Sequence, residues 1–392
     1  MDTSPSSRRR TGRWIPVSRF GRARAFVPDP LPPRAPSLRT DELLGPLDRA
    51  SNAVGRLQGV AGALPDPDLF LYWCVFREAV LSSQIEGTRS SLSELLLFDA
   101  RRPTEVGPLA DQTDVSNVVR ATNHAFRRLR EGFPVSSRLI REIHAVLLSS
   151  GRGSRKDPGH FRRSQVWIGG TSPENAHFVP APHDLVPVLI SQFEHFFHGP
   201  ARDMPPLIAA ALLHAQFETI HPFLDGNGRV GRLLITLVLC ERGVLDEPLL
   251  NLSLFLKARR SEYYERLNAV RTDGDWEGWC RFFLEGVAVT SAQVIAAAGE
   301  LQRLFARDRT RIERLGRSAG STLRVHDALR RRPVTDIASV VRRTHLSRPT
   351  VARAIKLLSR IGIVSRVDGR RRGAVFCYED FVRILDAGAE PL

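Results

Sequence analysis

The sequence has 392 residues and is poor in several residue types, each of which narrows what the protein can be. Cysteine is scarce, because the chain holds only four, and no two of them form a CxxC pair. A cysteine zinc site and a CxxC redox site are therefore excluded. We interpret the four cysteines as buried thiols in a reducing compartment.

Long apolar runs are also scarce. The first ten residues contain Ser and Arg but no apolar core, which argues against a signal peptide. The longest apolar stretches are either interrupted by charge or too short to span a bilayer. We therefore expect a cytoplasmic protein with no membrane partner.

Acidic residues are scarce at the two ends of the chain. Residues 1–24 carry seven Arg and one Asp, and residues 321–378 carry thirteen Arg and one Lys against three Asp. The formal net charge of the whole chain is +15, so the part between these segments is close to neutral. A basic end segment favours a polyanionic partner, with nucleic acid as the first candidate. A solvated, Arg-rich surface is the alternative.

The overall composition, with 42% hydrophobic and 25% charged residues, is that of a globular protein of two or three domains. Residues 1–36 are rich in Ser, Arg and Pro, which predicts an extended arm on the surface. Apolar spacing then predicts an all-α body. The predicted helices are 41–57, 67–84, 91–98, 112–130, 137–149, 185–197, 207–217, 229–241, 262–270, 276–288 and 291–314.

Residues 151–182 interrupt the helical pattern. Two short β-prone pieces, Gln165–Ile168 and Ala176–Val179, flank Gly169-Gly170, which predicts a β-hairpin. There is no internal repeat along the chain.

The segment 221–232, His-Pro-Phe-Leu-Asp-Gly-Asn-Gly-Arg-Val-Gly-Arg, is polar although two apolar helices flank it. A polar loop that enters a helix N-terminus is an anion site, because free N–H groups and the helix dipole attract negative charge. Gly226 and Gly228 let the backbone approach phosphate oxygens, and Arg229 and Arg232 add forked donors.

Other side chains of the segment carry chemistry. Asp225 can hold a Mg²⁺ that bridges phosphates, and His221 can accept a proton from a hydroxyl. Asn227 can donate to a phosphate, and Phe223 can anchor the loop. A capped inter-helix loop is the alternative interpretation, but such a loop needs neither a histidine nor two arginines.

The segment matches every fixed position of H-x-F-x-[D/E]-G-N-G-R-x-x-R and therefore resembles the signature of the Fic (filamentation induced by cAMP) family. The resemblance implies a helical bundle that transfers AMP from ATP to a Ser, Thr or Tyr hydroxyl of a protein, possible targets including the chain itself. It implies that His221 is the general base and Asp225 the Mg²⁺ ligand. It also implies these ATP-binding residues: Glu86, Gly226, Asn227, Gly228, Arg229, Val230, Gly231, Arg232 and Tyr263.

Two further segments extend the resemblance. Residues 158–162 (Pro-Gly-His-Phe-Arg) and 167–170 (Trp-Ile-Gly-Gly) are similar to the family's flap, a hairpin that positions the target, although Val166 stands where many relatives have Asn. An ordinary surface hairpin is the alternative. Tyr263 belongs to a tyrosine pair that is similar to one in this subgroup; its ring would line the adenine pocket or pack in the core.

Residues 82–87 (Ser-Ser-Gln-Ile-Glu-Gly) close a predicted helix and resemble the family's inhibitory motif [S/T]-x-x-x-E-[G/N]. Ser82 and Glu86 share one helix face. The resemblance implies that Glu86 pairs with Arg232 and occupies the donors needed by the γ-phosphate of ATP. A helix end with a glycine cap is the alternative.

Residues 321–378 predict a winged helix. Helices at 323–329, 336–343 and 347–360 are followed by two β-prone pieces around Asp368-Gly369. Arg348, Arg353 and Lys356 would lie on the third helix and residues 370–372, all Arg, at the wing tip. DNA binding through residues 321–378 is one hypothesis, and a basic protein-interaction module is the other.

The sequence thus predicts a mainly α protein: a Fic-type helical bundle with a β-hairpin flap and a C-terminal winged helix-turn-helix domain. The expected units are an arm at 1–36, a helical region with the inhibitory motif at 37–115, a catalytic core at 116–290, a linker helix at 291–317 and the winged domain at 318–392. The leading function is a protein adenylyltransferase, with a homodimer left open. The rival is a DNA-binding regulator whose Fic domain is vestigial or senses nucleotide, and a further alternative is another nucleotide donor.

Overall fold

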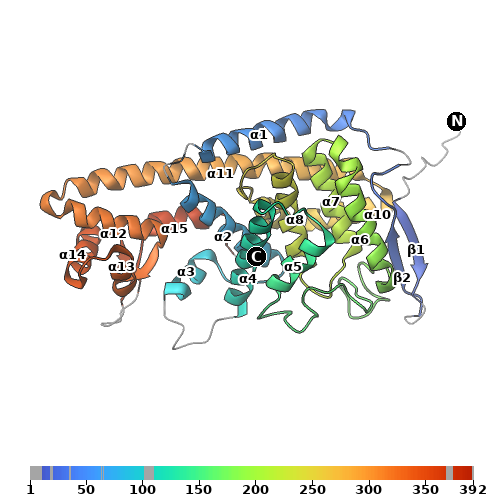
Figure 1. Ribbon diagram of the computed structural model, residues 1–392, viewed down its shortest axis with the longest axis horizontal. Coiled ribbons are helices and arrows are strands. Elements are labelled where there is room, and N and C mark those ends of the chain that lie inside the picture. Colours follow the sequence, from blue (N-terminus) through green and yellow to red (C-terminus); the bar gives the residue numbers. More distant parts are fainter. Residues whose placement is uncertain are drawn as a thin grey trace.

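The computed structural model describes most of the chain in seven stretches, which are residues 11–17, 21–34, 37–62, 64, 66–100, 110–367 and 374–390. Helices dominate these residues, which confirms the mainly α class (Figure 1). In chain order the α-helices are α1 (Leu44–Gly62), α2 (Pro67–Ile85), α3 (Leu92–Ala100), α4 (Ala110–Arg130), α5 (Ser137–Leu147), α6 (Val186–His198), α7 (Pro206–Ile220), α8 (Asn227–Glu241), α9 (Leu252–Ala258), α10 (Arg260–Asp273), α11 (Trp276–Glu313), α12 (Ala319–Arg331), α13 (Ile337–Thr344), α14 (Arg348–Arg360) and α15 (Glu379–Asp386).

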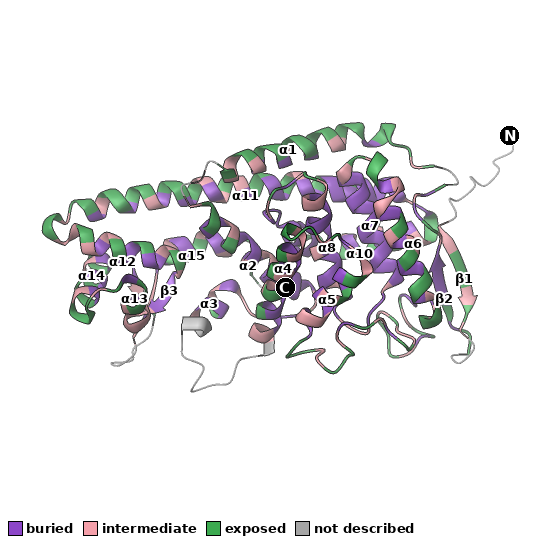
Figure 2. Ribbon diagram, viewed as in Figure 1, coloured by how far each residue is buried: buried purple, intermediate pink, exposed green. Residues whose placement is uncertain are grey.

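The centre of the helical body is α7, which is buried along its whole length from Leu207 to Ile220. Its sequence is apolar all round, as expected of a helix that neighbours enclose on every side. It packs against α8, and α6 and α11 cover it further. Figure 2 shows this buried centre around α7 and α8, with exposed faces on the outer helices. The loop between α7 and α8 is therefore mounted on the most rigid part of the molecule.

The longest helix is α11, where the sequence predicted two helices with a break near residue 289. The prediction of a break was wrong because neither Gly nor Pro stands there, and the hydroxyl of Thr290 donates to the carbonyl of Gly286 within the helix. Figure 1 shows α11 running along the long axis beside α1 and reaching the C-terminal elements.

By length and composition α11 is also long and apolar enough to cross a membrane, contrary to the expectation that no stretch qualifies. Half of its apolar window is buried inside the molecule.

The N-terminal residues form two strands where the sequence predicted only an extended surface arm. Strands β1 (Gly12–Pro16) and β2 (Arg24–Pro28) pair antiparallel, with Trp14 opposite Phe26. Phe26 is buried, and its N–H donates to the carbonyl of Val179 at 2.9 Å. This arm therefore packs against the segment that precedes α6.

The predicted hairpin at 165–179 is reduced to one antiparallel bridge, between Ile168 and Phe178. The turn is held by side chains, since the amide oxygen of Asn175 accepts from the N–H groups of Thr171 and Ser172. Two positive-φ glycines, Gly169 and Gly170, begin this turn. The segment is thus a loop with a short paired base.

The C-terminal elements α12 to α15 surround a small antiparallel sheet in the order β3-β5-β4. Its strands are β3 (Val334–Asp336), β4 (Ser365–Arg366) and β5 (Val375–Cys377). Helix α15 was not expected from the sequence, and neither was α9. The turn at 368–369 and the arginines at 370–372 lie outside the described residues.

Asp308 joins α11 to the C-terminal elements. Its carboxylate is fully buried and accepts from Arg307 at 2.9 Å and from the hydroxyl of Tyr378 at 2.7 Å. The carboxylate also raises the pKa of Tyr378, together with burial of the ring, which acts most strongly. One buried acid therefore holds two segments that are 70 residues apart in sequence.

Replacing Asp308 with Ala should destabilise this junction, because it leaves the buried hydroxyl of Tyr378 without its acceptor. We expect a loss of about 3 kcal/mol, measured as faster hydrogen–deuterium exchange in α12, β3 and α15. Exchange in α7 and α8 should stay unchanged. Asp327→Ala, which removes an exposed carboxylate of α12, should have little effect. Equal loss of protection in both variants would contradict the assignment.

Candidate functional site

The site is built on the sharp turn between α7 and α8. His221 ends α7 in the left-handed conformation, with φ of 50°, and its N–H donates to the carbonyl of Phe217. Gly226 precedes α8, also left-handed with φ of 79°. With a left-handed residue at each end, six residues are enough to reverse the chain. At Gly226 this conformation causes little strain, because glycine has no β-carbon.

Asn227 holds this loop in shape. Its side-chain oxygen accepts from the N–H of Phe223, and its NH₂ group donates to the carbonyl of Phe223, both at 2.9 Å. One of the two N–H donors of this NH₂ group is therefore used within the loop, and the expected contact of the other with a phosphate stays a prediction. Phe223 is buried, as expected for an anchor.

His144 of α5, which the sequence analysis missed, supports the loop from below. Its ring stacks on Phe223, with centroids 3.7 Å apart, and its Nδ1 accepts from the N–H of Gly159. Its Nε2 therefore carries the proton and donates to the carbonyl of Asp225 at 3.0 Å. Burial lowers the pKa of His144 to about 4, so the ring is neutral at pH 7.

Arg162 clamps the other side of the loop. Its Nε donates to the carbonyl of His221 at 2.9 Å, and the N–H of Arg162 donates to the carbonyl of Pro222. The side chain is almost fully buried and also donates to the carbonyl of Ala181. The sequence pointed to the segment 158–162 but assigned no role to this arginine. The only sign of a role in the sequence was that this charged residue stands next to Gly and aromatic residues.

Arg232 lies one turn inside α8 and is only 3% exposed. The structure brings it to both residues of the expected inhibitory motif. Its Nη2 is 2.7 Å from a carboxylate oxygen of Glu86, and its Nε donates to the hydroxyl of Ser82 at 2.9 Å. Nη2 also donates to the carbonyl of Ser82. The last turn of α2 thus occupies the donors of this arginine.

The carboxylate of Glu86 lies over the N-terminus of α8. A β-carbon on Gly228 would collide with it, so glycine leaves the space that the carboxylate fills. Burial opposes ionisation of Glu86, but Arg232, Arg229 and His221 outweigh it and lower its pKa. The carboxylate is therefore ionised at neutral pH.

Asp225 and Arg229 lie at the same end of α8. The Asp225 Oδ1 accepts from the N–H of Gly226 at 2.6 Å and is 3.4 Å from Nη2 of Arg229. Arg229 is buried, whereas the Asp225 side chain keeps about a third of its surface exposed. The backbone of Val230 and Gly231 forms the first turn behind them. Gly231 allows α8 to approach Glu218 of α7 closely.

No cluster of three or more metal-binding side chains occurs among the described residues. Asp225 is a single carboxylate with its second oxygen toward Gly153, a small and unobstructive neighbour. Mg²⁺ commonly uses one or two protein carboxylates and takes its other ligands from phosphates and water. The donor set therefore fits Mg²⁺ that arrives with a nucleotide better than a resident metal.

His221 has the properties of a base at neutral pH. Burial lowers its pKa to about 4, and Arg162 adds to this effect. Glu218, one turn earlier in α7, was missed by the sequence analysis, and burial raises its pKa to about 7. A carboxyl group and an imidazole of shifted pKa therefore stand together behind the loop, which is typical of functional sites.

The expectation that Tyr263 lines an adenine pocket is not supported by the structure. The ring is 1% exposed, and its hydroxyl lies 2.9 Å from Nε2 of His214 in the core. Core packing, the alternative interpretation, describes it better. Its neighbour Tyr264 is 40% exposed and is the member of the pair that a ligand could reach.

Two family models match this chain. Residues 44–127 match the Fic/DOC family N-terminal model, and residues 134–239 match the Fic/DOC family model, which includes the loop and both arginines of α8. The chain carries a Fic domain. The N-terminal model covers α2, so Ser82 and Glu86 belong to the matched region that precedes the Fic domain.

Relatives of known name share this region. Protein adenylyltransferase Fic of Drosophila mojavensis is 27% identical over 266 residues, which is 67% of this chain and 49% of that protein. The protein of the same name from Drosophila grimshawi is 28% identical over 228 residues, or 58% of this chain and 44% of that protein. The chain thus spans half or less of the length of these relatives.

Solved structures show the same fold. A Fic family protein from Desulfovibrio desulfuricans G20 superposes with a TM-score of 0.56 at 19% identity, covering 88% of this chain and 97% of that one. A fragment of Fic-1 from C. elegans gives a TM-score of 0.50 at 20% identity, covering 66% and 75%. At these identities the likeness concerns the fold alone.

The lowered pKa of His221 predicts how the Fic domain responds to pH. In an unfolded chain the imidazole has a pKa near 6.5. Its folded pKa of about 4 means that its contribution to stability is present above pH 6.5 and is lost as the pH falls toward 4. We expect the ring resonances of His221 in NMR spectra to stay constant from pH 8 to pH 5 and to move near pH 4. His221→Asn assigns the signal, and a midpoint near 6.5 would contradict the burial.

Proposed function

We propose that the protein is an adenylyltransferase that transfers AMP from ATP to a hydroxyl of a protein and that Glu86 restrains it. The single observation that carries this proposal is the contact of Glu86 with Arg232 over the N-terminus of α8. A carboxylate at this point imitates a phosphate, because it takes the same charged donors. The names of the curated relatives supply the reaction class.

The loop can perform this transfer with few groups. Neutral His221 accepts the proton of the target hydroxyl as its oxygen attacks the α-phosphorus. The bond to the bridging oxygen breaks, and pyrophosphate leaves. The backbone at Gly226–Gly228 and the guanidinium of Arg229 stabilise the negative charge that shifts to the phosphates. Catalysis then consists of positioning and of electrostatic stabilisation, as in phosphoryl transfer generally.

Asp225 would hold Mg²⁺ together with the phosphates. When bound, the ion neutralises phosphate charge and fixes the orientation of the nucleotide. The guanidinium of Arg229 lies 3.4 Å from the carboxylate of Asp225 and partly neutralises it. The guanidinium is therefore available to phosphates once a cation pairs with the carboxylate.

Glu86 would inhibit the transfer through its position alone. The Arg232 side chain can satisfy either the carboxylate or an outer phosphate, because both need the same N–H groups. The hydroxyl of Ser82 accepts from Nε and helps to keep the guanidinium in this orientation. ATP could enter the site with its phosphates displaced from the position that transfer requires.

The test is incorporation of label from α-labelled ATP with cell lysate as the source of target. We expect Glu86→Gly to raise the initial rate about 10- to 100-fold, the factor associated with regaining one charged hydrogen bond. Adding His221→Ala to Glu86→Gly should abolish labelling. Glu265→Gln, a matched loss of an exposed glutamate on α10, should behave like wild type.

Several results would overturn parts of this proposal. An unchanged rate in Glu86→Gly would refute the inhibitory role of Glu86 but not the transfer reaction. Labelling that survives His221→Ala would refute the assignment of His221 as the general base. Labelling from another nucleoside triphosphate, without labelling from ATP, would replace the donor. Absence of label in every variant would favour a nucleotide-sensing domain.

DNA binding by the C-terminal elements is a second candidate function, favoured by the surface of α14. Arg348, Arg353 and Lys356 are all exposed there, and none pairs with an acidic side chain among the described residues. We infer that α12 to α14 and the β3-β5-β4 sheet form a winged helix whose third helix presents these charges to phosphates.

This inference predicts salt-sensitive binding to duplex DNA. In a fluorescence anisotropy titration, affinity should fall about tenfold or more between 50 and 200 mM salt. Arg353→Gln with Lys356→Gln should weaken binding, and Arg309→Gln with Arg314→Gln, which removes two exposed cations at the end of α11, serves as the charge-matched control. Salt-independent binding, or none, would favour the protein-interaction module instead.

A further inference from the structure

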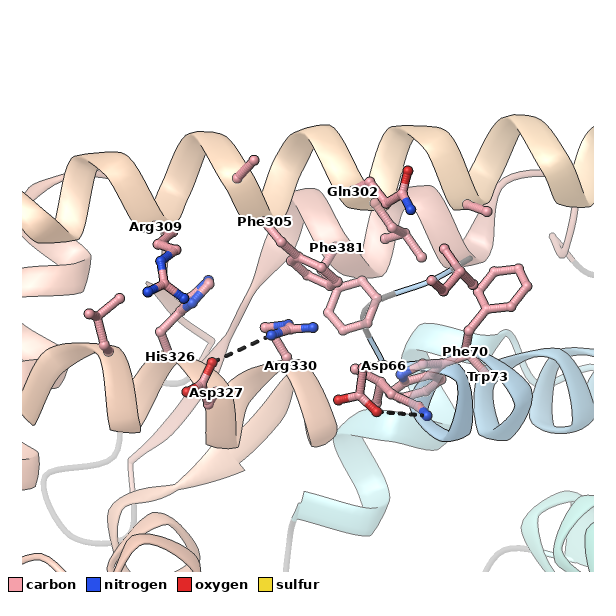
Figure 3. Close-up of a pocket in the computed structure, with 16 residues that line it drawn as sticks. Asp66, Phe70, Trp73, Gln302, Phe305, Arg309, His326, Asp327, Arg330 and Phe381 are labelled. Carbon is pink, nitrogen blue, oxygen red and sulfur yellow. Dashed lines mark hydrogen bonds and ion pairs between the residues drawn. The ribbon is translucent and has the colours of Figure 1, made fainter. Parts of the chain in front are cut away.

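A cavity of about 380 Å³ lies where the helical body meets the C-terminal elements, far along α2 from Glu86. It is enclosed by the first turns of α2, the middle of α11, and parts of α12 and α15 (Figure 3). This volume falls in the range of small-molecule sites, which favour boundaries between structural units. Its apolar lining combines aliphatic side chains with four aromatic ones, Phe70, Trp73, Phe305 and Phe381.

The aromatic rings form a rigid wall. Phe381 meets Phe305 edge to face, with centroids 5.2 Å apart, and meets Trp73 in the same way at 5.5 Å. The guanidinium of Arg330 lies over the ring of Phe305 at 4.4 Å. Such contacts fix the orientation of the rings without filling the space between them. The cavity is therefore shaped for a flat apolar body.

Two polar donors of the cavity wall have no partner among the described residues. The indole Nε1–H of Trp73 is buried, and the whole residue is only 3% exposed. The Nε–H of Arg330 is likewise buried and unpaired. Figure 3 shows Arg330 extending from α12 toward the side of the cavity on which Trp73 lies. Buried donors are nearly always hydrogen-bonded, so an acceptor is missing from this space.

The acidic groups of the cavity do not supply that acceptor. Asp66 accepts from the N–H of Leu69 and faces Arg331 at 3.5 Å. Asp327 lies 3.5 Å from Nη1 of Arg330, and its side chain is mostly exposed. His326 uses its Nε2 on the hydroxyl of Tyr378 and is neutral, because burial lowers its pKa to about 4. Each acid thus has a partner other than the two free donors.

We propose that this cavity binds a small aromatic carboxylate. The flat body of the ligand packs between Phe381, Phe305 and Phe70, and its two oxygens accept from Trp73 and Arg330. A carboxylate matches the site because both unpaired groups donate and one of them is cationic. The proposal concerns binding alone and does not depend on the adenylyl transfer proposed above.

The test uses 1-naphthaleneacetate as the probe in calorimetric titrations of the full chain, with uncharged 1-naphthaleneacetamide as its matched control. We expect saturable 1:1 binding of the acid and at least tenfold weaker binding of the amide. Arg330→Gln should weaken binding of the acid about 10- to 100-fold, and Trp73→Phe, which keeps a ring but removes the donor, about fivefold.

Two further variants keep the test independent of folding defects. Ala306→Leu narrows the cavity without changing its charge and should abolish binding, whereas Arg314→Gln removes an exposed cation outside the cavity and should have no effect. The proposal is overturned if the wild type shows no saturable binding up to about 10 mM. It is overturned equally if the amide binds as well as the acid, or if neither Arg330→Gln nor Trp73→Phe changes the affinity. Water alone then satisfies the two donors.

Discussion

The buried charge of Arg232 is the constraint around which the site is arranged. A guanidinium this deep in a protein needs anionic or carbonyl partners, because burial without them is costly. Three acids from two helices face it, Glu78 and Glu86 from α2 and Glu218 from α7. Burial raises the pKa of Glu78 and of Glu218 to about 7, whereas Glu86, in direct contact, has a lowered pKa. Only Glu86 therefore carries a full counter-charge at neutral pH.

The contacts that hold the loop in shape are independent of the group that is bound at Arg232. The turn between α7 and α8 is held by Asn227 within the loop and by His144 and Arg162 from outside it, and none of these contacts involves Glu86. Displacing the carboxylate of Glu86 would leave those hydrogen bonds intact. The loop is thus preorganised for a ligand. The carboxylate of Glu86 occupies the position next to Arg232 where we propose that an outer phosphate of the ligand would bind.

The sequence predicted most of the helices and the polar loop, because each depends on local spacing, but it missed α9 and α15 and divided α11 in two. The contact of Arg232 with Glu86 was expected only from the resemblance to the inhibitory motif. It did not predict the roles of His144 and Arg162, whose partners are backbone carbonyls distant in sequence. The sequence left two interpretations of Tyr263 open, and the structure favours core packing; which tyrosine of the pair faces the core depends on how the helix is oriented. The strands β1 and β2, which pair with each other, were missed because proline density suggested an isolated arm, while the contact that holds Phe26 against the body is made by Val179, far away in sequence.

Helix α2 connects regions that the sequence treats as separate units. Its first turns line the aromatic cavity, and its last turn carries Ser82 and Glu86. Between them, Arg77 donates to the carbonyl of Ala387, and Gln84 donates to that of Ala389 at 2.8 Å, so the segment after α15 lies along the helix. Ala389 is buried there against Leu81 and Leu254.

A shift of the C-terminal elements would have to break these contacts or move α2 with it, and a movement of α2 would shift Glu86 relative to Arg232. The same contacts that bury α2 therefore connect the C-terminal elements to the Glu86 carboxylate, which lies over the N-terminus of α8.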